Sequence, residues 1–162
     1  MYITLENYAQ IYDEIDEKTF NRLCFDACRV MDIHTTGIDR VRKLQRFFPT
    51  DTYAVEAVKR CAAKVINLMY QINQAEQSAS GAYEATDMGI RGKYISSISA
   101  GNESVSYTSG ETGKTAIDAA VADVEKRDNL LANTVRSYLS GVEDANGVCL
   151  LYMGKYPGRF LC

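Results

Sequence analysis

This sequence of 162 residues contains no tryptophan, one histidine and two prolines. It has no run close to the roughly 20 apolar residues that span a bilayer, and its opening MYITLE lacks the pattern of a secretory signal, so we expect no membrane partner and synthesis in the cytosol. Its 18 basic and 21 acidic side chains give a formal net charge of -3 without a basic stripe, which disfavours sequence-specific nucleic-acid binding. The five cysteines are odd in number and fall in apolar runs or at the last position, which favours free thiols over a disulfide framework.

Residue patterns typical of catalytic, phosphate-binding or metal sites are also scarce. His34 is the only candidate histidine base and has no nucleophile motif beside it. The glycine loop 110–115, GETGKT, looks like a phosphate-binding loop, but Thr108 stands where that motif requires its first glycine. Cys24 and Cys28, with Cys61 on the next long helix and His34, could form a metal site. However, Cys24 and Cys28 lie in the apolar stripe of their helix, and a cationic histidine is favoured near a helix end. We therefore predict no catalytic residue, no metal and no cofactor.

The remaining composition is that of one globular domain over residues 1–162. Apolar residues make up 46% of the chain and charged residues 24%. A domain of this length buries roughly 70% of its unfolded surface, which is enough for a core without metal or disulfide.

Apolar residues at helical spacing predict three long helices. The first covers Glu17–His34 after a cap at Asp16, with Gly37 ending it in a left-handed conformation; the second runs from Tyr53 to about Gln77. The third follows a cap at Thr115 and runs to residue 139, with apolar positions at Ile117, Ala120, Val121, Val124, Leu131, Val135, Tyr138 and Leu139. Short helical stretches are expected at 5–12, capped by Thr4, and at the basic turn 38–47.

Between the second and third helices the composition changes. Residues 78–92 are small and polar with several glycines, which predicts a flexible linker. Residues 93–108 hold two β-rich runs separated by a glycine-containing turn, which predicts a β-hairpin with Ile95, Ile98, Val105 and Tyr107 as contact residues. Because a lone hairpin is marginal in water, we expect it to contact the helices, a ring neighbour or a channel wall.

The C-terminal stretch 142–162 is too apolar to be a free tail and too short to form its own core. Its apolar run comprises Val148, Cys149, Leu150, Leu151, Tyr152 and Met153. We expect this extended segment to dock, either in this subunit or on another. The complete prediction is a mainly α fold, a bundle of three long helices plus short helices, with an inserted β-hairpin and an extended C-terminal docking segment.

Four stretches, taken in order, resemble one family. They are MYITLENYAQIY at 1–12, VKRCAAKVINLM at 58–69, ISSISAGNESVSYT at 95–108 and GVCLLYMG at 147–154. Their order and type are similar to those of the head-tail adaptor proteins, also called connector or head-completion proteins, of long-tailed phages and prophages of Gram-positive bacteria.

The resemblance implies a structural virion protein at the head-tail junction, not an enzyme. Such a protein forms a ring, commonly of twelve copies, under the portal protein, extends the channel through which DNA passes without sequence-specific binding, and presents a surface to a neck or tail completion protein. On this hypothesis residues 148–153 dock on the portal, and the hairpin contacts ring neighbours or the channel.

Two other classes remain open at this stage. One is a tail-side ring component such as a tail terminator, which binds the end of the tail tube. The other is a small cytosolic helical protein with a regulatory or nucleic-acid-binding role that uses the basic turn, whose four cations are Arg40, Arg42, Lys43 and Arg46.

Overall fold

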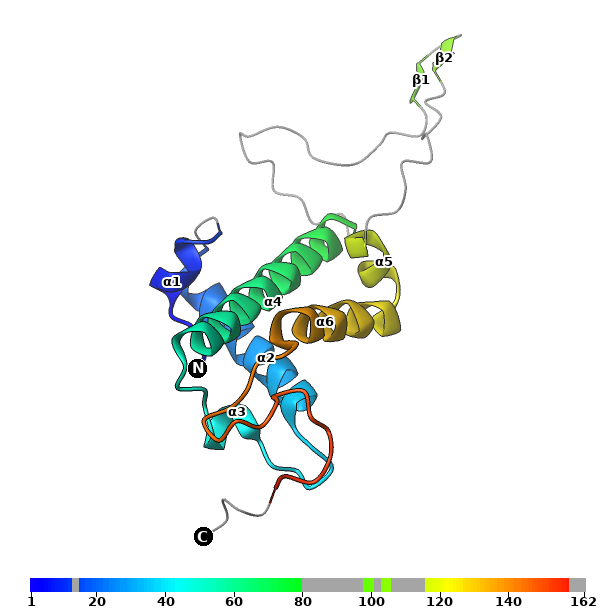
Figure 1. The fold of residues 1–162 in the computed structure, drawn as a ribbon. Coiled ribbons are helices and arrows are strands. Elements are labelled where there is room, and N and C mark those ends of the chain that lie inside the picture. Colours follow the sequence, from blue (N-terminus) through cyan, green and yellow to red (C-terminus); the bar gives the residue numbers. More distant parts are fainter. Residues whose placement is uncertain (13–14, 80–97, 101–102, 106–115, 158–162) are drawn as a thin grey trace.

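The computed structural model describes residues 1–12, 15–79, 98–100, 103–105 and 116–157 (Figure 1). The fold is mainly helical, as predicted. Its helices are α1 (Leu5–Ala9), α2 (Glu17–Thr35), α3 (Lys43–Arg46), α4 (Thr52–Ala79), α5 (Ala116–Ala122) and α6 (Val124–Leu139). None of the described helices combines the length and hydropathy needed to cross a bilayer.

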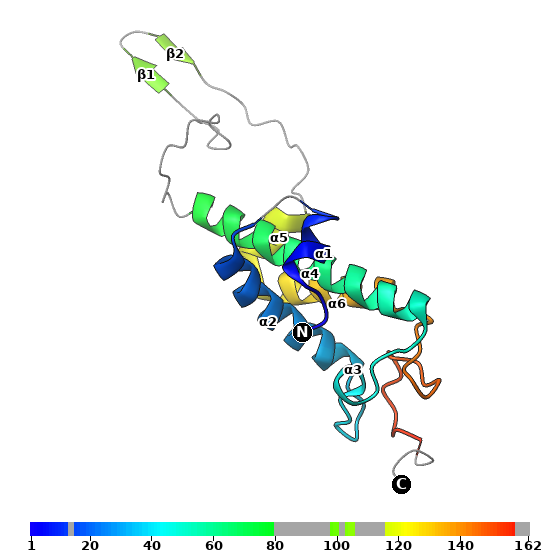
Figure 2. The same ribbon diagram turned by 90° about the vertical axis from the view of Figure 1, so that its left-hand side faces the viewer.

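Helix α4 is the centre of the core, and α2 and α6 pack on it (Figures 1 and 2). Its apolar stripe recurs every three or four residues, so one face can be buried along most of its length. That face is completely buried at Val58, Cys61, Ala62, Val65 and Ile66. The facing side chains come mainly from α2 (Phe20, Leu23, Cys24, Ala27, Met31) and α6 (Leu131, Val135, Leu139).

Side-chain caps fix the starts of the first two helices as the sequence predicts. Thr4 Oγ1 accepts a hydrogen bond from the backbone N–H of Asn7 at 3.3 Å, and Asp16 Oδ1 accepts one from Thr19 at 2.9 Å. These caps satisfy backbone donors that have no partner within the helix. The predicted cap at Thr115 lies outside the described residues.

The prediction of one continuous third helix is wrong, because the chain breaks at Asp123. This residue is extended, with φ -148 and ψ 118, and its carboxylate accepts hydrogen bonds from the N–H groups of Glu125 and Lys126. It therefore caps α6 instead of continuing α5. Val124, predicted to be core, is 67% exposed as a result.

The end of α2 also differs from the prediction. Gly37 is not among the positive-φ residues; its role is a close approach, because a Cβ there would lie 2.5 Å from the carbonyl oxygen of Gly154. In the predicted basic helical turn 38–47 only Lys43–Arg46 is helical, and Arg40 has a φ of 60. The first helix ends at Ala9, three residues earlier than predicted.

Between α4 and α5 the structure describes two short strands. Strand β1 (Ile98–Ala100) pairs antiparallel with β2 (Glu103–Val105), and Ile98 is the register partner of Val105. Of the predicted hairpin contacts, Ile95 and Tyr107 lie outside the described residues, as does most of the predicted linker. The first two linker positions, 78 and 79, belong instead to α4.

Candidate functional site

After α6 the chain turns back and forms a structured loop, residues 142–157, here called the C-terminal segment. Gly141, with φ +74, makes the turn that ends α6. The N–H of Leu150 then donates to the carbonyl of Val142 at 2.8 Å, and that of Asp144 to the carbonyl of Val148 at 2.9 Å. Leu150 is completely buried in the core cluster. The segment therefore docks on its own subunit, one of the two alternatives that the sequence left open.

A buried lysine holds this segment in place. Lys43 of α3 is only 1% exposed, and its Nζ donates to the carbonyls of Cys149 at 3.3 Å, Leu150 at 2.8 Å and Tyr152. Burial lowers the pKa of Lys43, because the charged form loses hydration. The three carbonyls replace the water that an ammonium group would otherwise bind.

A second set of hydrogen bonds ties the end of the segment to the loop after α2. Tyr156 donates its hydroxyl to Asp144 Oδ2 at 2.6 Å and its backbone N–H to Asp39 Oδ2 at 2.6 Å. Burial and the hydrogen bond to Asp144 raise the pKa of Tyr156 to about 12. The backbone donors of Tyr156 and Val41 lower the pKa of Asp39. Through its two carboxylate oxygens, Asp39 therefore joins the turn that carries Arg40 both to the C-terminal segment and to Val41.

The residues predicted to dock on a portal are divided between core and surface. Leu150 is fully buried, and Val148, Cys149 and Leu151 are half-buried. Tyr152 and Met153 are 47% and 50% exposed. The carbonyl of Met153 accepts the N–H of Ile38 at 3.0 Å, which places exposed Ile38 beside them. We call Ile38, Tyr152 and Met153 the apolar tip.

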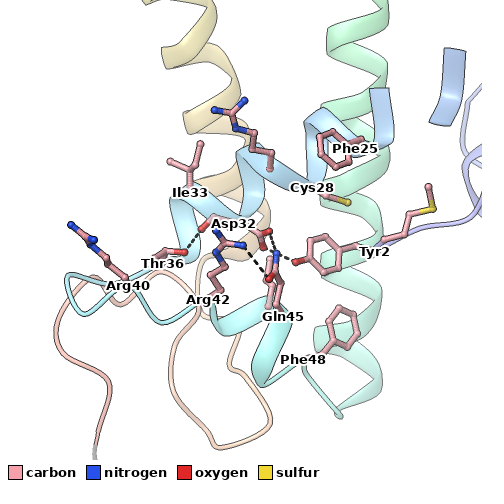
Figure 3. Close-up of a pocket in the computed structure, with 13 residues that line it drawn as sticks. Tyr2, Phe25, Cys28, Asp32, Ile33, Thr36, Arg40, Arg42, Gln45 and Phe48 are labelled. Carbon is pink, nitrogen blue, oxygen red and sulfur yellow. Dashed lines mark hydrogen bonds between the residues drawn. The ribbon is translucent and has the colours of Figure 1, made fainter. Parts of the chain in front are cut away.

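A groove of about 1080 Å³ lies between the N-terminal residues, α2 and α3 (Figure 3). Asp32 is at its centre and accepts hydrogen bonds from the Tyr2 hydroxyl at 2.6 Å and from Gln45 Nε2 at 2.6 Å. Burial, and then the hydrogen bond to Asp32, raise the pKa of Tyr2. The remaining lining is a mixture of apolar and cationic side chains, among them Met1, Phe25, Arg29, Ile33, Arg40 and Arg42. The sequence gives no signal for this groove, because its residues come from three separate stretches.

The residues considered for metal binding are not gathered into a site. Within the described part of the chain, no cluster of three or more candidate ligands is present. Cys24 and Cys61 are buried, and Cys28 is half-buried in the groove wall. His34 differs from the prediction of a favoured cation: burial and then the positive charge of Arg136 lower its pKa, so the neutral imidazole is favoured.

The comparisons with known proteins add no identification. No protein-family model, no curated protein and no solved structure matches this chain.

Proposed function

We propose that this protein is a head-tail adaptor: a structural virion protein that forms a ring under the portal, extends the DNA channel and joins the capsid to a neck or tail completion protein. The four sequence stretches that resemble this family are the starting point. The mainly helical fold with an ordered C-terminal segment is compatible with that resemblance.

The observation that carries the proposal is the apolar tip. Tyr152 and Met153 are exposed although the adjacent backbone is held by buried Lys43. Exposed apolar groups on a rigid support lose little conformational entropy when they bind, which suits a protein contact. Tyrosine and methionine are also enriched in the buried centres of interfaces. The portal-docking hypothesis for 148–153 therefore narrows to Tyr152 and Met153, with Ile38 beside them.

The basic turn gives less support to a nucleic-acid-binding role than its sequence suggested. Of its four cations, Lys43 is buried and engaged with backbone carbonyls. The other three are exposed. Since affinity for duplex DNA rises with the number of phosphates neutralised, the loss of one cation from so short a turn weakens this alternative.

The test mixes the purified chain with portal rings from the same source and examines them by electron microscopy for an added symmetric layer. Deleting residues 148–162 would also remove the core residue Leu150 and could unfold the protein. Substitutions in the apolar tip are therefore a better test, because they separate loss of binding from loss of folding. We expect the double variant Tyr152→Ser and Met153→Asp to fold and to lose the layer. The matched control Tyr53→Ser alters an exposed tyrosine at the start of α4 and should keep the layer.

Two outcomes would count against the proposed function, and a third would count only against the docking assignment. Absence of a layer with the native chain contradicts portal binding; binding to tail-tube ends in its place would identify a tail-side ring component. Binding to duplex DNA that weakens steeply with salt would support the regulatory class. A layer that survives the tip substitutions would refute the docking assignment alone.

A further inference from the structure

Asn146 and Gly147, in the C-terminal segment, form a dipeptide with a chemistry of its own. Asn146 is the only asparagine of the sequence that precedes a glycine. In such a pair the backbone nitrogen of the glycine can attack the side-chain amide carbon of the asparagine, because glycine has no Cβ to hinder the approach. Whether the two groups react depends on how the fold holds them.

The turn that contains this dipeptide uses both of its residues. Gly147 has a φ of +73, a conformation that favours glycine over residues with a Cβ. The side chain of Asn146 donates from Nδ2 to the hydroxyl oxygen of Tyr156 at 3.0 Å, and that hydroxyl donates in turn to Asp144. The residues that make the dipeptide reactive are therefore the same ones that build the turn.

Hydrogen bonds hold both reacting groups while the C-terminal segment is closed. The N–H of Gly147 donates to the backbone carbonyl of Asp144 at 3.0 Å. The side chain of Asn146 is held by Tyr156, and its backbone N–H donates to Asp144 Oδ1 at 2.9 Å. Gly147 is exposed and Asn146 half-buried, so these hydrogen bonds protect the dipeptide more than burial does. Attack requires Gly147 to give up its N–H proton and Asn146 to rotate, and the closed segment opposes both.

We propose that Asn146 is a site of spontaneous modification: when the C-terminal segment opens, the nitrogen of Gly147 attacks the Asn146 side chain and the asparagine deamidates. A bond forms between the Gly147 nitrogen and Asn146 Cγ, and the bond from Cγ to Nδ2 breaks. The side-chain nitrogen leaves as ammonia with the proton that Gly147 gave up. Water then opens the resulting five-membered ring at one of its two carbonyls, which yields aspartate or isoaspartate without an oxidant or a cofactor.

The product does not restore the native turn. A carboxylate replaces the amide, so the hydroxyl of Tyr156 loses the donor that Asn146 supplies, and a second negative charge lies close to Asp144. In the isoaspartate form the backbone is also longer by one CH₂ group, which displaces Gly147 from its carbonyl partner. We therefore expect deamidation to turn a reversible opening of the C-terminal segment into a permanent one. This inference goes beyond the proposed function and does not depend on it.

The test follows deamidation of the full-length chain at mildly alkaline pH by mass spectrometry of the tryptic peptide 137–155, which contains Asn146. We expect the native chain to react more slowly than the urea-unfolded chain by about tenfold or more. The variant Tyr156→Phe releases the side chain of Asn146 and should react about tenfold faster than the native chain. The matched control Tyr152→Phe removes a hydroxyl from an exposed tyrosine of the same segment and should react at the native rate.

Circular dichroism establishes that both variants fold, and a second measurement uses the native chain alone. Urea below the unfolding midpoint should accelerate deamidation in parallel with hydrogen exchange at the amide of Gly147, because both need the same opening. The inference is overturned if the folded chain reacts as fast as the unfolded one, if Tyr156→Phe reacts at the rate of Tyr152→Phe, or if deamidation does not follow this exchange. Native protection of the Leu150 amide in the isolated deamidated chain would contradict the permanent opening.

Discussion

Substitution of Lys43 by methionine tests whether the C-terminal segment depends on one buried ammonium group. Methionine keeps most of the apolar stem and removes the donor. The carbonyls of Cys149, Leu150 and Tyr152 then lose the group that all three share. The helices away from α3 should be unaffected, because these acceptors all belong to the C-terminal segment.

The expected loss follows from two opposing contributions. A buried acceptor left without a partner costs about 1–3 kcal/mol. Only the hydrogen bond to Leu150 is fully buried, and the carbonyl of Cys149 still accepts the N–H of Tyr152. Removing Lys43 also removes the desolvation cost that lowers its pKa, and a loosened segment can expose its carbonyls to water. We therefore expect the free energy of unfolding to fall by about 1–3 kcal/mol, the cost of one buried acceptor left without a partner.

Urea unfolding measures this change as a shift of the midpoint at constant slope. Hydrogen exchange locates it: the amide of Leu150, which donates to the carbonyl of Val142, should lose protection more than amides in α4. The control is Lys155→Met, because Lys155 is exposed in the same segment and should change stability by less than about 0.5 kcal/mol. Equal stability of Lys43→Met and the native chain would show that the lysine does not hold the segment.

Three further changes probe other features. Asp123→Ala removes the cap of α6 and should lower stability by about 1 kcal/mol in thermal unfolding, whereas Asp128→Ala should be neutral; equal effects would contradict the capping role. Gly37→Ala places a Cβ 2.5 Å from a backbone oxygen of the C-terminal segment and should cost about 1–3 kcal/mol in urea unfolding, so a neutral result would refute that close approach. The folded state raises the pKa of Tyr156 from 10.0 to about 12. The stability that the protonated Tyr156 hydroxyl contributes is therefore complete below pH 10 and is lost as the pH rises toward 12. The free energy of unfolding of Tyr156→Phe should therefore fall less than that of the native chain between these pH values. The same pH dependence in both proteins would contradict a raised pKa for Tyr156.

The sequence predicts the main helices well because their signals are local. The apolar periodicity of α2 and α4 and the caps at Thr4 and Asp16 each depend on residues within a few turns. The break at Asp123 was missed because an aspartate within a helix and one that caps a helix look alike in a single sequence. A usable signal is present: the turn between Val124 and Leu131 has charged residues, Arg127 and Asp128, at the positions where a buried helix face would have an apolar one.

The candidate surfaces were harder to predict because they depend on distant contacts. Lys43 belongs to the predicted basic turn, and nothing near it in the sequence indicates that its partners lie at 149–152. In the run 148–153, periodicity could not separate buried Leu150 from exposed Met153, because the segment is an irregular loop. The groove combines α2 with two short stretches whose approach only the tertiary structure reveals.

The attachment of the C-terminal segment has a consequence for the order in which the protein forms during synthesis. The hydrogen bonds from Lys43 to Leu150 and from Tyr156 to Asp39 join positions 107 and 117 residues apart. Helices α2 and α4 can pair while the ribosome is still making the later residues, but the turn around Arg40 gains its fixed shape only after position 156 has emerged. The groove and the apolar tip are therefore completed last, when the helices that support them have already been made.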